Sequence, residues 1–235
     1  MTMLEETRAL LDRVLLPDAP KLSSLPLERA RRMFQGAAEL LDLPAPDLAR
    51  VTDITIPGPG GALPLRLYDP TGEGEDGPAA VFFHGGGWVY GNLATHHRLC
   101  AEIARRLGLR VVAVDYRLAP EHPFPAAVED SLAALRWAAS SPAELGGRVT
   151  GLVPMGDSAG GNLAAVACQQ LAGSGKTPLL AQCLFYPATD VANGYASAEQ
   201  YAQGYMLDTE DLHFFTRAYL PRRALRADPR VSPML

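Results

Sequence analysis

Cysteine is scarce in this sequence of 235 residues, which has only Cys100, Cys168 and Cys183. The three positions lie far apart in apolar surroundings, so neither their number nor their spacing favours a disulfide framework. Cysteine is also among the residue types most often found inside proteins. We therefore expect reduced, buried thiols and a cytoplasmic protein.

The sequence has neither an excess of positive charge nor a long hydrophobic run. Its 21 Lys and Arg residues against 26 Asp and Glu residues give a net charge of −5, which argues against nucleic acid or an anionic membrane as a partner. No apolar stretch approaches the ~20 residues that would span a bilayer. The N-terminal stretch MTMLEETRALLDRV is acidic and amphipathic, unlike a signal peptide. A content of 48% apolar and 20% charged residues indicates an ordinary globular protein.

Apolar strand-like runs alternate with helical patterns along most of the chain. Strands of this kind, nearly continuous in apolar residues, are typical of a parallel sheet covered by helices on both faces. Pro59, Gly60 and Gly61 join the first two strands and predict an antiparallel hairpin. Helices are expected at 3–16, 26–42, 96–108, 126–141 and 161–173, and strands at 51–58, 62–70, 79–83, 110–116, 151–156 and 179–187. The predicted fold class is α/β, with a mostly parallel sheet that opens with this hairpin.

Gly156-Asp157-Ser158-Ala159-Gly160 lies between a predicted buried strand and a predicted helix. Glycines on both sides of Ser158 allow a sharp turn that presents the serine hydroxyl, as in a nucleophile elbow. Such a hydroxyl attacks a carbonyl carbon once a base accepts its proton. The alternative interpretation is a glycine-rich turn that merely packs a helix on a sheet.

A second glycine-rich motif, His84-Gly85-Gly86-Gly87-Trp88, directly follows a predicted strand. Consecutive glycines let the main chain approach a substrate closely, so that backbone N–H groups can stabilise the negative charge that develops on a carbonyl oxygen. A phosphate-binding loop is the weaker alternative, because no P-loop lysine follows and no GxGxxG spacing is present.

These two motifs, together with VDYRLAPEHPFPAA (114–127) and YPATD (186–190), resemble those of the hormone-sensitive-lipase-like (bacterial family IV) carboxylesterases of the α/β-hydrolase superfamily. The resemblance implies a serine hydrolase acting on small, short-acyl esters, with a small-molecule ester as its partner and no cofactor or metal. It implies Ser158 as the nucleophile. It places the oxyanion-hole donors on the backbone amides of Gly86, Gly87 and Ala159.

The resemblance also implies supporting roles for other polar residues. Asp157 is expected to orient the groups around the serine, and His84 to anchor the oxyanion loop by hydrogen bonds. Asp115, Arg117 and Glu121 are expected to form one buried polar network that braces the loop after the fourth strand.

By the same resemblance, residues 1–235 form a single α/β-hydrolase domain. Its parts are an N-terminal helical cap segment (1–50), a sheet core (51–187) and cap helices (188–235). The family's triad acid and histidine motifs, DPLRDE-like and HGF-like, do not occur in the sequence. We therefore expect a C-terminally truncated fold that lacks the last two strand–helix units, either as a natural fragment or as a shortened form. The sixth strand then becomes an apolar sheet edge, which makes a homodimer one expected state.

The sequence contains five histidines as candidates for the base that serves Ser158. His96 and His97 begin a predicted helix, where neighbours point about 100° apart, so we expect capping or solvent exposure. His122 is expected to be a loop residue. His213 falls in a helix that Asp208 or Thr209 can cap and that carries an apolar stripe, formed by Leu212, Phe215 and Tyr219.

Since no histidine fits the role of base well, we expect weak or absent ester hydrolysis by this chain alone. Two alternatives stay open at this point. One is a non-catalytic small-ligand-binding protein on the same scaffold, and the other is a related amidase or deacetylase.

Overall fold

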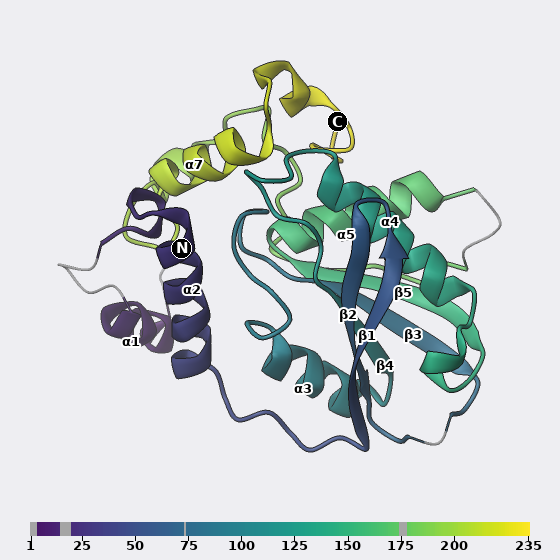
Figure 1. Cartoon of the computed structure of the whole chain (residues 1–235). Coiled ribbons are helices and arrows are strands. Elements are labelled where there is room, and N and C mark those ends of the chain that lie inside the picture. Colours follow the sequence, from purple (N-terminus) through teal and green to yellow (C-terminus); the bar gives the residue numbers. More distant parts are fainter. Residues whose placement is uncertain (1–3, 15–19, 73, 174–177) are drawn as a thin grey trace.

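The computed structural model describes residues 4–14, 20–72, 74–173 and 178–235. A six-stranded sheet in the order β1-β2-β4-β3-β5-β6 runs through the described part (Figure 1). The strands are β1 Arg50–Gly58, β2 Gly61–Asp69, β3 Gly77–Phe83, β4 Arg110–Val114, β5 Val149–Asp157 and β6 Cys183–Phe185. The pair β1–β2 is the predicted antiparallel hairpin, and β2 pairs antiparallel with β4. The pairs β3–β4, β3–β5 and β5–β6 are parallel, which confirms the predicted α/β sheet.

Helices cover both faces of this sheet. They are α1 Glu5–Val14, α2 Leu27–Leu41, α3 His97–Leu107, α4 Ala126–Ala139, α5 Ala159–Leu171, α6 Ala196–Gln200 and α7 Thr209–Tyr219, with short 3-10 turns η1 Leu22–Ser24, η2 Ala143–Leu145 and η3 Arg223–Ala227. Alternate side chains of β4 point to opposite faces, as strand geometry requires. Val112 and Val114 pack with α4 and α5, whereas Val111 and Ala113 pack with α3.

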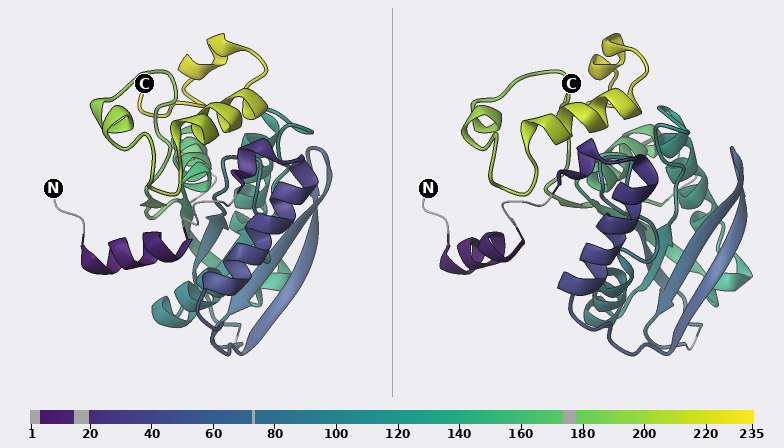
Figure 2. Two further views of the ribbon diagram at one scale, coloured as in Figure 1. Left: turned by 90° about the vertical axis from the view of Figure 1, so that its left-hand side faces the viewer. Right: turned by 60° about the vertical axis from the view of Figure 1, so that its left-hand side comes forward.

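The segments before β1 and after β6 meet beside the sheet (Figures 1 and 2). Lys21 joins them, because its Nζ lies 3.0 Å from both Asp208 and Glu210. Asp208 is the N-cap of α7 and forms a capping box with Asp211. Of the two predicted caps, Asp208 and Thr209, the structure therefore has Asp208. These contacts hold α7 close to η1 and so bring the two segments over one end of the sheet.

The predicted strand 179–187 is too long. Only β6 Cys183–Phe185 forms a strand, with one further bridge between Leu152 and Leu179. Among the described residues β6 pairs with β5 alone, so one edge of this strand lacks a neighbour. Leu180 is 61% exposed and Tyr186 is 77% exposed. Within the described ranges, this one-sided pairing agrees with the expected apolar sheet edge.

The expected polar network of Asp115, Arg117 and Glu121 is also wrong, because each residue has a separate partner. Arg117 binds the buried carboxylate of Asp130 with Nε 2.9 Å from Oδ2. Glu121 forms an exposed pair with Arg31, at 2.7 Å. Asp115 accepts a backbone hydrogen bond from Leu93, and burial raises its pKa to about 6.

The three cysteines are free, but only partly buried. Cys100 lies in the interior against β4, as predicted, whereas Cys168 and Cys183 are half-buried. Cys168 and Cys183 lie beside the edge of the sheet formed by β6, where fewer neighbours cover them than cover Cys100.

Candidate active site

The turn between β5 and α5 has the geometry of a nucleophile elbow. β5 ends at Asp157, α5 begins at Ala159, and Ser158 between them has φ 52° and ψ −116°. A non-glycine residue with positive φ is uncommon and is held in place by its surroundings. Here the Ser158 N–H donates to the Phe185 carbonyl at 2.9 Å, and the Ser158 carbonyl accepts from the Ala188 N–H at 3.1 Å.

The glycines of the motif allow α5 to start directly on the sheet. A β-carbon on Gly160 would overlap the carbonyl oxygen of Phe83, and one on Gly156 would overlap the backbone of Gly160. The spacing of glycines around Ser158 is therefore a packing requirement at the crossing of β3, β5 and α5.

The oxyanion loop follows β3 and turns back sharply at its glycines. Gly86 has φ +114° and Gly87 has φ +63°, and a β-carbon on Gly87 would overlap the Phe215 ring. The Gly86 carbonyl accepts hydrogen bonds from the N–H groups of Val89 and Tyr90. Within the described ranges, the N–H groups of Gly86 and Gly87 have no hydrogen-bond acceptor.

The predicted oxyanion donors converge on the serine. The Ala159 N–H lies in the first turn of α5, where amides lack an intrahelical partner. Gly86, Gly87 and Ala159 line the same cavity as Ser158. The structure thus brings together the four residues that the sequence assigned to the nucleophile and the oxyanion hole.

This cavity has a volume of about 560 Å³ and opens between the sheet and the helices above it. Its wall near the serine includes Trp88 and Tyr186. The opposite wall is mostly apolar. It is formed by residues that precede β1 and residues that follow β6 in the chain, namely Leu22, Phe34, Met206, Leu207, Leu212 and Phe215. Such a pocket suits a small molecule with an apolar part and one polar reacting group.

Asp157 connects the elbow to the oxyanion loop. Its Oδ1 accepts a hydrogen bond from the Gly85 N–H at 2.8 Å and lies 3.2 Å from Nε2 of His96. The residue is 7% exposed. The expectation that Asp157 orients its surroundings agrees with these two contacts.

His84 holds the first residues of the loop. Its Nδ1 lies 2.8 Å from the Gly85 carbonyl, and the Tyr116 hydroxyl donates to the His84 carbonyl at 2.6 Å. The imidazole stacks on the Tyr116 ring with centroids 4.3 Å apart. Burial, together with the nearby His96, lowers the pKa of His84 to about 3. The ring is therefore neutral near pH 7 and donates from Nδ1 to the carbonyl.

None of the five histidines has a hydrogen bond to the Ser158 hydroxyl among the described residues. His122 and His213 are exposed. His97 is half-buried, with Nδ1 3.2 Å from the Tyr68 hydroxyl. On the helix of His213, two members of the predicted apolar stripe, Leu212 and Phe215, line the cavity, and the third, Tyr219, is buried.

The expectation for His96 is wrong. His96 occupies the N-cap position of α3, but its side chain makes no capping bond and instead contacts Asp157. Sequence reasoning missed this residue, because nothing in the local pattern around a helix start indicates a partner on a distant strand.

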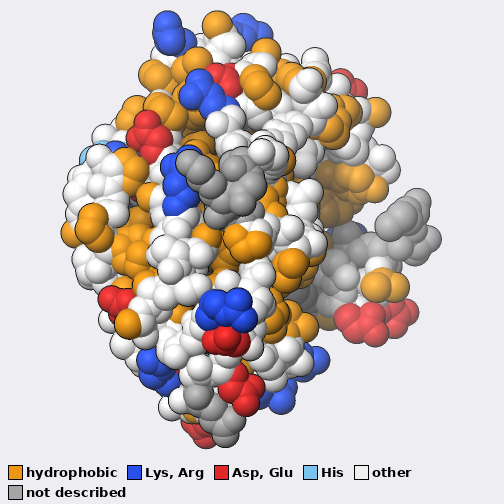
Figure 3. Space-filling model, turned by 90° about the vertical axis from the view of Figure 1, so that its right-hand side faces the viewer, with side chains coloured by type: hydrophobic (Ala, Val, Ile, Leu, Met, Phe, Trp, Pro, Cys, Tyr) orange, Lys and Arg blue, Asp and Glu red, His pale blue; other side chains and the backbone are white. Residues whose placement is uncertain are grey.

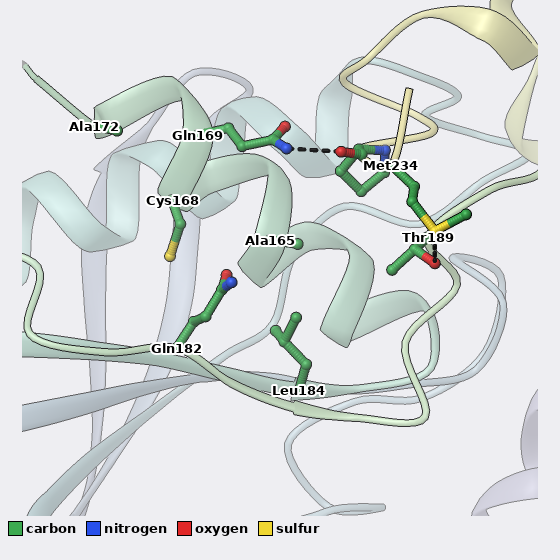
Figure 4. A pocket seen from close by; sticks show the side chains of 9 residues that line it. Ala165, Cys168, Gln169, Ala172, Gln182, Leu184, Thr189 and Met234 are labelled. Atoms are coloured by element: carbon green, nitrogen blue, oxygen red, sulfur yellow. Dashed lines mark hydrogen bonds between the residues drawn. The ribbon is translucent and has the colours of Figure 1, made fainter.

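A second hollow lies on the outer side of α5 and β6 (Figure 4). It has a volume of about 380 Å³ and is lined by Ala165, Cys168, Gln169, Ala172, Gln182, Leu184, Thr189, Pro233 and Met234. Gln169 closes one end by donating to the Pro233 carbonyl at 2.7 Å. Ser158 does not line it, so this groove is separate from the candidate active site.

Among the described residues, no cluster of His, Cys, Asp and Glu side chains is arranged to hold a metal ion. Within the same ranges, no helix combines the length and the apolar character needed to cross a membrane.

Known proteins resemble this chain in both sequence and structure. A family model described as the alpha/beta hydrolase fold matches residues 80–235. The carboxylic ester hydrolase LipN of Mycobacterium tuberculosis is 45% identical over 201 residues, which cover 82% of this chain and 53% of LipN. An ethyl acetate hydrolase of Pseudomonas putida is 37% identical over 219 residues, covering 91% of this chain and 69% of that protein. The chain thus spans about half the length of LipN.

Solved structures agree with this comparison. An ester hydrolase from the metagenome of Lake Arreo superposes with a TM-score of 0.92 at 37% identity, covering all of this chain and 76% of that one. A hyperthermophilic esterase from the archaeon Pyrobaculum calidifontis gives the same TM-score at 35% identity and the same coverage. Together with the elbow and oxyanion-loop motifs, these matches show that the chain belongs to the α/β-hydrolase fold family, in its hormone-sensitive-lipase-like (family IV) carboxylesterase branch.

Proposed function

We propose that this protein is a serine carboxylesterase that hydrolyses small, short-acyl carboxylic esters. The observation that carries the proposal is the convergence of the Ser158 elbow and the amides of Gly86, Gly87 and Ala159 on one cavity. The esterase names of its relatives support the same reaction class. In this proposal, segments 1–50 and 188–235 act as a cap over the sheet core and form the apolar wall that receives the substrate.

In the proposed reaction, Ser158 Oγ attacks the ester carbonyl carbon while its proton passes to a base. The carbonyl oxygen becomes an oxyanion and accepts hydrogen bonds from the three amides. Collapse of this intermediate expels the alcohol, which takes up the proton, and leaves an acyl group on Ser158. Water then attacks the acyl carbon in the same way and releases the acid and the free serine.

Among the described residues, no histidine is placed to accept the proton of Ser158. His84 and His96 are engaged elsewhere, and no imidazole in the described part is bonded to Ser158. We therefore propose that the chain by itself hydrolyses esters slowly. Without a base to accept its proton, the Ser158 hydroxyl is a weak nucleophile, so attack on the ester is slow.

The test compares the parent chain with Ser158→Ala. We expect slow turnover of p-nitrophenyl acetate by the parent and loss of the turnover above background in the variant. Thr189→Ser, which lines the separate groove, is the matched control and should behave like the parent. Equal rates for the parent and Ser158→Ala would overturn the esterase proposal, and turnover at ordinary esterase rates would overturn the claim of weak activity.

A non-catalytic small-ligand-binding protein is the second candidate, favoured by a cavity of about 560 Å³ that contains an unactivated serine. A fluorophosphonate probe separates the two candidates, since it labels only an activated serine hydroxyl. Slow, Ser158-dependent labelling supports the esterase, whereas tight ligand binding without labelling supports the binding protein. A comparison of p-nitrophenyl acetate with p-nitroacetanilide tests the further alternative of an amidase, and acetylated sugars and amines test that of a deacetylase.

We also propose that the protein works in the cytoplasm, which the three unpaired thiols support. A homodimer remains a proposal as well. Hydrophobic side chains gather in several places on the face shown in Figure 3, and the groove of Figure 4 borders the unpaired edge of β6. An exposed strand edge of this kind can pair with a second chain.

A further inference from the structure

We propose that His96 is a positioning residue for the oxyanion loop. It holds the Asp157 carboxylate in the orientation in which that carboxylate accepts the Gly85 amide. The proposal rests on the function proposed for the Ser158 site, and it gives a role to a histidine that the local sequence marks only as the start of a helix.

One carboxylate oxygen joins the two halves of the site. Asp157 precedes the nucleophile Ser158, and Gly85 precedes the oxyanion-loop residue Gly86. Oδ1 of Asp157 accepts the Gly85 N–H at 2.8 Å, and the same oxygen lies 3.2 Å from Nε2 of His96. The position of the loop relative to the nucleophile therefore depends on the orientation of this side chain.

The carboxylate needs both partners to be fixed. A single hydrogen bond from Gly85 would allow rotation about the bond to the carboxyl group, whereas donors from two different elements define one orientation. The fit is also close, since a β-carbon on Gly85 would overlap the other oxygen, Oδ2. With its side chain only 10% exposed, Asp157 has little water available to replace a lost partner.

His96 is itself held in place on every side. Its Nδ1 lies 2.8 Å from the Thr95 hydroxyl, and its ring lies between those of Phe82 and His84 at centroid distances of 5.9 and 5.6 Å. With the proton on Nε2, His96 donates to Asp157, while its Nδ1 and the Asn92 carbonyl both lie 2.8 Å from the Thr95 hydroxyl oxygen and share its one proton. The side chain is 13% exposed, which keeps this geometry away from bulk solvent.

The effect on catalysis follows from where the loop is anchored. Bonds from Val89 and Tyr90 to the Gly86 carbonyl hold the far side of the loop, and the bond from Gly85 to Asp157 holds the near side. Loss of His96 loosens the near side, so the Gly86 and Gly87 amides no longer stay fixed where the oxyanion forms. Because the oxyanion exists only in the reaction, kcat should fall while KM changes little.

The experiment compares three variants of the full chain. His96→Gln keeps an N–H donor near the position of Nε2, His96→Met fills similar space without a donor, and His97→Met is the matched control at the neighbouring histidine. Two quantities are measured on each chain. They are hydrogen exchange of peptides covering 84–91 by mass spectrometry, and kcat and KM for p-nitrophenyl acetate.

We expect His96→Met to speed exchange in 84–91 by about 10-fold and to lower kcat by about 10- to 100-fold, since hydrogen bonds to charged groups are strong. KM should stay within about twofold, as for a group that acts on the transition state. His96→Gln should restore both readings to near the parent values, and His97→Met should leave both unchanged. His96→Ala provides a second donor-free variant if the Met variant does not fold.

Two results would overturn the proposal. One is a donor-free variant that matches His97→Met in exchange and kcat, and the other is a His96→Gln variant as impaired as His96→Met at equal thermal stability. The exchange reading does not depend on hydrolysis. If Ser158→Ala shows that the esterase proposal is wrong, exchange still decides whether His96 holds the loop.

Discussion

Gly160 at the start of α5 lies so close to the carbonyl oxygen of Phe83 at the end of β3 that a β-carbon on residue 160 would overlap that oxygen. The helix that follows the nucleophile therefore rests directly on the strand that precedes the oxyanion loop. Backbone touches backbone at this point, and neither side has a flexible side chain that could move aside. The position of Ser158 relative to the loop of residues 84–88 is thus set partly by the absence of one methyl group.

Gly160→Ala should destabilise the fold by about 2–3 kcal/mol, as overpacking of a tightly packed interior does. Gly36→Ala is the matched control, because Gly36 is exposed in the middle of α2 and a β-carbon there meets nothing within 4 Å. That variant should gain about 0.5–1 kcal/mol from the better helix propensity of alanine. Urea unfolding followed by circular dichroism measures both free energies, and a neutral Gly160→Ala would contradict the close contact.

Buried His84 predicts a loss of stability in mild acid. Burial lowers its folded-state pKa to about 3, well below the value of about 6.5 expected in the unfolded chain. Between these two values the unfolded chain binds more protons at this residue, so the free energy of unfolding falls as the pH falls, by up to about 1.4 kcal/mol per pH unit. Its contribution is fully present above pH 6.5.

The measurement is urea unfolding of the parent and of His84→Asn at pH 7, 6 and 5. Other groups titrate in both chains, so the difference between the two chains isolates the histidine. Between pH 7 and 5 the parent should lose about 2 kcal/mol more than the variant. Parallel pH profiles would show that His84 does not keep this low pKa.

The buried pair of Arg117 and Asp130 predicts that Arg117→Met lowers the free energy of unfolding much more than Arg66→Met does. Nε of Arg117 lies 2.9 Å from Oδ2 of Asp130, whose side chain is only 2% exposed. Arg117→Met leaves that carboxylate without its charged partner and should cost about 3–5 kcal/mol.

Arg66→Met is the matched control, because Arg66 pairs with Asp53, whose side chain is 64% exposed. Exposed pairs contribute about 1 kcal/mol or less, so this variant should stay close to the parent. Thermal unfolding of both variants provides the comparison. Equal losses would mean that the burial of Asp130 does not govern the outcome.

Much of this fold could be predicted from sequence, because its strands and helices carry strong local patterns. The hairpin whose turn lies between Gly58 and Gly61 pairs β1 and β2 antiparallel, as predicted. The glycine motifs also predicted the sharp turn at Ser158 and the loop after β3, since a β-carbon on Gly156, Gly160, Gly86 or Gly87 would overlap neighbouring atoms. Where the chemistry depends on backbone conformation, sequence is a direct guide.

Contacts between distant segments could not be predicted in this way. His96 binds Asp157 only because folding brings the N-terminal end of α3 to the last residue of β5, and no periodicity in either segment encodes the pairing. The same holds for Asp115, Arg117 and Glu121, which are neighbours in sequence yet turn to different partners. The apolar run 179–187 predicted too long a strand for a related reason, since strand pairing depends on the partners that a segment acquires and not on its composition alone.

Within the described residues β6 has one unpaired edge, which predicts concentration-dependent association. Leu180, in the segment that leads into β6, is 61% exposed, and a lysine beside an edge strand disfavours pairing with another chain. Analytical ultracentrifugation of the parent should show a mass that rises with concentration from one chain towards two. Leu180→Lys should remain at the mass of one chain over the same range.

Leu40→Lys is the matched control, because Leu40 is 84% exposed on α2, away from β6, and should associate like the parent. A parent chain that stays monomeric throughout, or a Leu40→Lys variant that loses association as Leu180→Lys does, would contradict a dimer formed at this edge.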